Sequence, residues 1–123
     1  MDVQELVNIV NGTVLTPSVP LSREVKGGCG ADLMSDVLAS IKPEAVLLTG
    51  LCNNQVVRTA QMADVCVIVF VRGKMPSADI ITLAEEENIP LITSPFGTFE
   101  LCGRLYAAGL NSFEAEIPSN SND

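Results

Sequence analysis

The sequence predicts an α/β domain of three layers with a mainly parallel sheet. Three apolar runs, at residues 45–49, 65–71 and 89–93, have the length of strands. They are hydrophobic throughout instead of alternating with polar residues, which is typical of strands that helices cover on both faces. A segment with helical spacing follows each run. The resulting order, β-α-β-α-β-α, favours parallel strands joined by right-handed crossovers.

The expected helices follow from apolar residues that recur three and four positions apart. Pro43 ends the helix that precedes the first long strand, because the residue before a proline avoids helical angles. Gly109 followed by Leu110 is typical of a helix C-terminus. The pattern predicts helices at residues 32–41, 54–63, 77–88 with Ser77 as a cap, and 98–109 with Thr98 as a cap.

The N-terminal third is less regular. It is expected to begin with a helix at residues 3–10 and a short strand at 13–16. Residues 17–30 form a loop-rich connection with another short strand near Val25, and they end in a glycine-rich turn, Gly27-Gly28-Cys29-Gly30. At the other end, residues 111–123 are polar and are expected to be a frayed tail. A single domain is therefore predicted over residues 1–110.

Composition excludes several classes of function. The net charge is −8, the opposite of what a protein needs to neutralise nucleic-acid phosphates or to lie on an anionic membrane. The chain has no histidine, which is the commonest zinc ligand and the usual general base near pH 7. No apolar run is long enough to span a bilayer, and no secretory signal is visible. We therefore expect a cytoplasmic domain without a metal or other cofactor.

The four cysteines contain no C-x-x-C pair, so a zinc site or an iron–sulfur cluster has little support. Cys66 lies inside an apolar strand, and Cys102 lies on the apolar stripe of the last helix. Both are expected to be structural. Cys29 and Cys52 fall in loops, where they could be reactive or simply structural.

Ligands of open α/β sheets bind beyond the carboxyl ends of the strands. The loops that leave the three long strands hold small, hydroxyl, amide and cationic residues, and helix N-termini follow them. A small anion or a nucleotide phosphate is plausible there, although short loops with glycine also serve simply as turns. The candidates are Thr49, Gly50, Asn53, Asn54, Arg72, Gly73, Lys74 and Ser94.

A second candidate site is the Gly28-Cys29-Gly30 turn, followed by Asp32 and Asp36. The turn could be an anion nest, and the two carboxylates could hold a divalent cation or an arginine of a partner. They could equally be a solvated helix face. The sequence does not match either standard phosphate-binding motif. A P-loop ending at Gly73-Lys74 would need its first glycine at position 68, which is Ile68. A dinucleotide fingerprint beginning at Gly28 would need its third glycine at position 33, which is Leu33.

An ordered series of segments resembles the stand-alone DRTGG-domain proteins. The match covers residues 1–110, although the pentapeptide Asp-Arg-Thr-Gly-Gly itself is absent. The resemblance implies a domain similar to the N-terminal domain of HPr kinase/phosphorylase, one that is regulatory and has no catalytic residues to carry over. The segments are 28–38, Leu48-Thr49-Gly50-Leu51, Val57-Arg58-Thr59-Ala60, 68–76, Ile89-Pro90-Leu91 and 103–110.

Two hypotheses about function follow. The first is a non-catalytic regulatory module that binds a small ligand or a partner protein. The second is a small enzyme or phosphocarrier that uses Cys52, Cys29 or Asp36 as a covalent site. A homodimer is also expected, because several apolar residues lie outside the predicted stripes and an apolar patch commonly marks an interface. These residues are Leu51, Met75, Phe96, Phe99 and Phe113.

Overall fold

The computed structural model describes residues 1–116, which form one five-stranded sheet with helices on both faces. The strand order is β1-β5-β4-β3-β2. Neighbours among β2, β3, β4 and β5 are parallel, and β1 at the edge is antiparallel to β5. The α/β fold with a mainly parallel sheet is therefore confirmed. The strands are β1 (Thr13–Val14), β2 (Gly27–Gly30), β3 (Ala45–Thr49), β4 (Val67–Phe70) and β5 (Leu91–Thr93).

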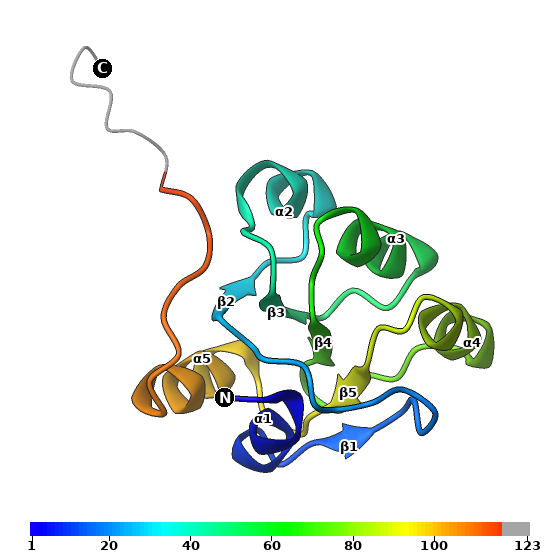
Figure 1. Cartoon of the computed structure of the whole chain (residues 1–123), viewed down its shortest axis with the longest axis horizontal. Coiled ribbons are helices and arrows are strands. Elements are labelled where there is room, and N and C mark those ends of the chain that lie inside the picture. Colours follow the sequence, from blue (N-terminus) through cyan, green and yellow to red (C-terminus); the bar gives the residue numbers. More distant parts are fainter. Residues whose placement is uncertain (117–123) are drawn as a thin grey trace.

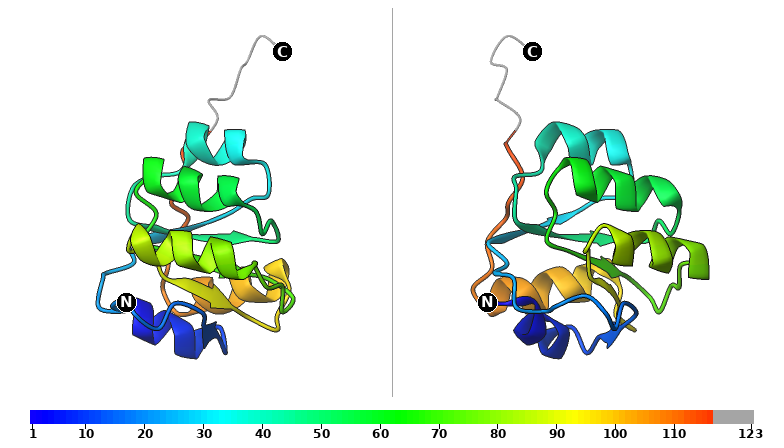
Figure 2. Two further views of the ribbon diagram at one scale, coloured as in Figure 1. Left: turned by 90° about the vertical axis from the view of Figure 1, so that its right-hand side faces the viewer. Right: turned by 45° about the vertical axis from the view of Figure 1, so that its right-hand side comes forward.

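The helices lie in two unequal layers (Figures 1 and 2). One face of the sheet is covered by α2 (Met34–Ser40), α3 (Asn54–Met62) and α4 (Ala78–Glu86), which are the crossovers between consecutive parallel strands. The other face is covered by α1 (Val3–Ile9) and α5 (Thr98–Ala107). Among these described helices, none has both the length and the apolar character needed to cross a membrane.

The apolar strands supply both halves of the core. Every residue of β3 and β4 is buried. Because successive side chains of a strand point to opposite faces, Leu47 packs toward α2 and α3, while Val46 and Leu48 pack toward α1 and α5. The absence of polar alternation in these runs is therefore explained by helices on both sides.

The glycine-rich segment before α2 is a strand and not the expected turn. Gly27–Gly30 pairs with Ala45–Leu48 as β2, and within residues 1–116 only Gly73 and Gly109 among the glycines adopt positive φ. Glycine is needed here for space: a Cβ on Gly27 would lie 2.3 Å from the Cβ of Phe113. The short strand expected near Val25 is reduced to an isolated bridge between Asp2 and Glu24.

Residues 111–116, which the sequence assigns to a polar tail, run along the outer edge of β2 (Figure 1). The N–H of Gly28 donates to the carbonyl of Asn111 at 2.9 Å, and the N–H of Phe113 donates to the carbonyl of Gly28 at 2.8 Å. These bonds satisfy backbone groups that an edge strand would otherwise leave unpaired. The rest of the expected tail, 117–123, lies outside the described residues.

Three helix ends differ from the expectation in detail. Helix α2 begins at Met34, so Asp32 precedes it. Gly97, not Thr98, is the N-cap of α5, and Ser77 is the N-cap of α4 but makes no capping hydrogen bond with its side chain. At the C-terminus of α5, Gly109 has a φ of +98° and the N–H of Leu110 donates to the carbonyl of Leu105, as predicted.

Candidate functional site

A cleft of about 480 Å³ lies where the carboxyl ends of β3 and β4 meet the start of α5. It brings together residues of four segments that are far apart in the sequence: the exit of β2, the exit of β3, the exit of β4 and the first residue of α5. Several of the sequence-predicted candidates meet here. The lining residues are Asp32, Gly50, Leu51, Val71, Arg72, Lys74 and Thr98.

The two cations are presented by a tight turn after β4. Arg72 and Gly73 have φ angles of +57° and +66°, and the N–H of Lys74 donates to the carbonyl of Val71 at 3.1 Å. The loop after β5 holds this turn, because Arg72 N–H donates to the carbonyl of Phe96 at 2.8 Å. A left-handed backbone at arginine costs about 1–2 kcal/mol, so the fold maintains an unfavourable conformation at this position.

The electrostatic environment of the cleft differs from that of the acidic chain as a whole. Among residues 1–116, Arg72 and Lys74 form no ion pair with a carboxylate, as is also true of Lys42 and Arg58, whereas Arg23, Lys26 and Arg104 each form one. Arg72 Nε lies 3.6 Å from where a Cβ on Gly97 would stand, so the guanidinium is next to the N-terminus of α5. That helix has no side-chain cap, and its first N–H groups add partial positive charge.

Asp32 lines the same cleft as these cations. Its Oδ1 accepts hydrogen bonds from the N–H of Gly50 at 2.8 Å and from Thr49 Oγ1 at 2.9 Å. These two bonds, and to a smaller extent the charge of Lys74, lower the pKa of the Asp32 carboxyl. Asp32 is therefore ionised at neutral pH, and its second oxygen makes no protein hydrogen bond within residues 1–116.

Three further predicted candidates have structural contacts instead of a place in the cleft. Ser94 is fully buried, and its hydroxyl donates to the carbonyl of Val10 at 2.7 Å. Asn53 caps α3 by accepting from the N–H of Val56. Thr49 is buried and donates to Asp32, as described above. Asn54 is the exposed first residue of α3 and does not line the cleft.

Leu51, Val71 and Thr98 line the cleft but are not among the sequence-predicted candidates. The available signal was position, because Leu51 and Val71 lie in the loops that leave β3 and β4, and Thr98 begins α5 directly after the loop that leaves β5. The sequence predicts Thr98 as a helix cap, whereas in the structure it is the first residue of α5 and lines the cleft together with Gly50 and Arg72.

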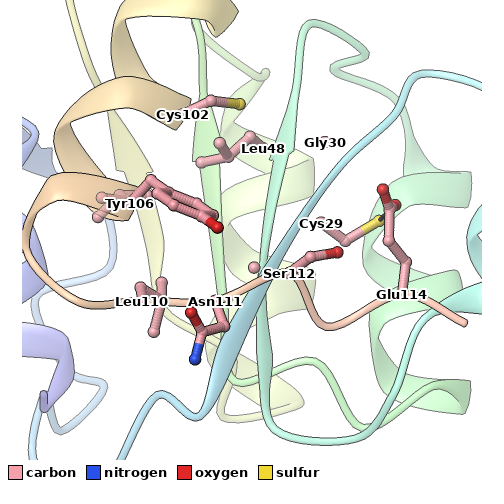
Figure 3. Close-up of a pocket in the computed structure, with 11 residues that line it drawn as sticks. Cys29, Gly30, Leu48, Cys102, Tyr106, Leu110, Asn111, Ser112 and Glu114 are labelled. Carbon is pink, nitrogen blue, oxygen red and sulfur yellow. Dashed lines mark hydrogen bonds between the residues drawn. The ribbon is translucent and has the colours of Figure 1, made fainter.

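Apart from Asp32, which lines the cleft, the residues of the second predicted site lie on two other surfaces. Gly28, Cys29 and Gly30 line a separate cavity of about 200 Å³ between β2, α5 and the segment 111–116 (Figure 3). Asp36 is exposed on α2 and borders a neighbouring hollow with Glu114. Because β2 is an extended strand, its N–H groups do not converge as those of an anion nest do.

The thiols show no sign of activation. Burial, and after it the hydrogen bond that the thiol donates to Glu114 Oε2 at 3.0 Å, together raise the pKa of Cys29 to about 12. Burial likewise raises the pKa of Cys52, and raises that of Cys66 to about 12. Cys66 is buried, as predicted. The prediction that Cys102 points into the core is wrong, because this residue is exposed. The described residues contain no group of three His, Cys, Asp or Glu that could hold a metal ion.

Comparisons with solved structures and with family models identify a protein of similar fold and the family of this chain. The crystal structure of the CBS and DRTGG domains of the regulatory region of Clostridium perfringens pyrophosphatase, complexed with its activator diadenosine tetraphosphate, is similar with a TM-score of 0.66 and 17% sequence identity. The alignment covers 83% of this chain and 44% of that chain, so this protein spans less than half of it. No curated protein sequence matches. Because the family model for the DRTGG domain matches residues 5–108, the chain belongs to the DRTGG domain family.

Proposed function

We propose that this DRTGG domain is a non-catalytic regulatory module that binds a small anionic ligand of the nucleotide class in the cleft between β3, β4 and α5. The observation that carries the proposal is the position of Arg72 and Lys74. In a chain of net charge −8, these two cations are free of carboxylate partners among residues 1–116, and they lie beside the uncapped N-terminus of α5.

The chemistry of the lining fits a phosphate linked to a group that donates hydrogen bonds. Arg72, Lys74 and the first N–H groups of α5 would bind the phosphate oxygens. The free oxygen of Asp32 would accept from a ribose hydroxyl or a base amino group, and the Thr98 hydroxyl could bond to either part. The turn that carries Arg72 is held by backbone hydrogen bonds, so ordering the site on binding would cost little.

The strain at Arg72 also supports a role in binding. Residues held in sparsely populated backbone regions cluster at ligand sites. Asn11, Asp64 and Asn88 also have positive φ, but each follows the end of a helix, where a left-handed residue completes the C-terminus. Glu44, with a φ of +70°, lies in the turn directly before β3. Arg72 follows a strand and has no such structural reason.

The comparisons are consistent with this class of ligand. The similar solved structure is a regulatory region complexed with a dinucleotide activator, and a DRTGG domain is part of it. By analogy with such an arrangement, we propose that ligand binding here changes the affinity of the domain for a partner protein.

Isothermal titration calorimetry with AMP, ATP, diadenosine tetraphosphate and inorganic pyrophosphate tests the proposal. We expect at least one of them to bind to the wild-type chain, and we expect the variant Arg72→Gln/Lys74→Gln to lose at least tenfold in affinity. Arg58→Gln is the control for a distant charge, because Arg58 is exposed on α3 and its substitution removes one positive charge away from the cleft, where the double variant removes two. Equal losses in Arg58→Gln and in the cleft variant, or no binding of any of these ligands, would overturn the proposal.

A further inference from the structure

The face of the sheet that carries α5 is incompletely covered near β2. Within residues 1–116, three helices cover the opposite face and two, α1 and α5, cover this one (Figure 1). Gly28 and Gly30 have no side chains to fill the space, and the cavity of about 200 Å³ remains beside α5. Apart from Glu114, its walls carry no charged group, and apolar side chains of Leu48, Leu105 and Leu110 form much of them.

An exposed apolar stripe on α5 borders this cavity. Phe99 is 94% exposed and Tyr106 is 70% exposed, and Cys102 is exposed between them. Positions separated by three and seven residues share one side of a helix. Figure 3 shows Cys102 and Tyr106 extending from α5 toward β2. Gly103 lies at the middle of the same helix, and within residues 1–116 nothing beyond its chain neighbours and its own helix backbone lies within 4 Å of where its Cβ would be.

We propose that two copies of this chain associate through α5, packed antiparallel across a two-fold axis, so that Phe99 of each copy enters the β2–α5 cavity of the other. The stripe has the symmetry that such an interface requires. Phe99 and Tyr106 lie equally far from the midpoint between Cys102 and Gly103, about 5 Å along the helix axis. A two-fold axis at that midpoint brings the protruding ring of one copy to the open cavity of the other.

The charges at the two ends of the stripe are complementary in this arrangement. The N-terminal end of α5 lies beside Arg72 and Lys74. The C-terminal end lies beside Glu114, which lines the cavity with Tyr106 and borders a hollow that also contains Asp36 and Glu116. Glu100 in the first turn of α5 and Arg104 in its last turn pair with each other at 2.9 Å within one copy. Antiparallel packing therefore places the basic cleft end of each copy against the acidic end of the other, and it opposes the two helix dipoles favourably. A second copy therefore matches this surface in shape and in charge.

Light scattering on the eluting size-exclusion peak measures the association. For the wild-type chain we expect twice the mass of 13.0 kDa at micromolar concentration. The substitution Phe99→Asp should reduce the mass to one chain. Since Phe99 is almost fully exposed in one copy, the circular dichroism spectrum of the variant should match that of the wild type. Met62→Asp is the matched control, because Met62 is 71% exposed on α3 at the other face, and it should remain a dimer.

Cross-linking tests the position of the two-fold axis. Cys102 lies within one residue of the proposed axis, so a short bis-maleimide should link the two copies through it. Cys102→Ser should abolish the cross-link, and Cys52→Ser should leave it intact. A wild-type mass of one chain, a dimer that persists in Phe99→Asp, or a cross-link that survives in Cys102→Ser would each overturn the proposal. None of these outcomes depends on the binding of a nucleotide.

Discussion

The carboxylate of Asp32 joins the exits of two neighbouring strands. Its Oδ1 accepts from the Gly50 N–H at 2.8 Å and from the Thr49 hydroxyl at 2.9 Å, so the end of β2 is tied to the end of β3 at the edge of the cleft. Because both bonds favour the ionised carboxyl, they lower its pKa. The bonds therefore stabilise the fold in a manner that depends on pH.

We expect Asp32→Asn to lower the free energy of unfolding by about 1 kcal/mol at pH 7. The loss is small because solvent screens the charge of this exposed carboxylate. A carboxyl whose pKa is lower in the folded state adds stability above the unfolded-state value of about 3.9, and loses it as the pH falls through the folded-state value. The difference between the two proteins should thus shrink below about pH 4. Urea unfolding from pH 3 to pH 7 measures it. Asp36→Asn, at an exposed carboxylate of α2, should show no such difference.

Arg72→Gly should separate stability from binding. Glycine removes the left-handed penalty of about 1–2 kcal/mol but loses about 0.5–1 kcal/mol through the entropy of the unfolded chain, so we expect a net gain of about 0.5–1 kcal/mol. The same variant should bind nucleotide more weakly. Arg72→Ala should bind as weakly without the gain in stability, because alanine retains the penalty. A loss of stability in Arg72→Gly would contradict this account of the turn.

Ser94→Ala should be strongly destabilising although the residue lies in a loop. The hydroxyl is fully buried, donates to the carbonyl of Val10 at 2.7 Å and accepts from the N–H of Phe96 at 3.2 Å. Its removal leaves both groups unpaired and should cost about 1–3 kcal/mol in the free energy of unfolding. Ser35→Ala, at an exposed position of α2, serves as the control and should change stability by less than about 0.5 kcal/mol.

Gly27→Ala tests the packing of the C-terminal segment on β2. The added Cβ would meet Phe113 at 2.3 Å, whereas a Cβ on Gly28 would meet its nearest neighbour at 3.5 Å. We expect Gly27→Ala to cost about 1–3 kcal/mol and Gly28→Ala to cost much less. Adding Phe113→Gly should remove most of the penalty that Gly27→Ala introduces. Equal effects of the two alanine substitutions in denaturant titrations would show that Phe113 does not limit the space at Gly27.

The long apolar runs were sufficient to predict the centre of the fold. Residues 45–49, 65–71 and 89–93 contain β3, β4 and β5, and helices lie between them where the periodicity placed them. Periodicity depends on neighbours two to four positions away, so one stretch of sequence contains the whole signal. The left-handed residue at Gly109 was predictable for the same reason, because the helix stop is a local pattern.

The residues of the cleft were predictable only as a set of loops. Ligands of open parallel sheets bind beyond the carboxyl ends of the strands, which predicts a site in the loops after β3, β4 and β5. Gly50, Arg72 and Lys74 from these loops do line the cleft. Sequence could not separate Arg72 from Ser94, which lies in a loop of the same kind. Burial separates them: the serine is enclosed against Val10, a residue 84 positions away, while the arginine is exposed.

The role of the glycine-rich segment was decided by tertiary structure alone. Gly27-Gly28-Cys29-Gly30 has a composition typical of a turn, yet it is a strand because β3 pairs with it and Phe113 packs on Gly27. Cys102 is exposed beside the β2–α5 cavity for a related reason, since within residues 1–116 no third helix lies beside α5 on that face. The amino-acid pattern thus determines which segments become strands and helices through local contacts. Which residues share a surface depends on contacts between distant segments, and these form only when the sheet is assembled.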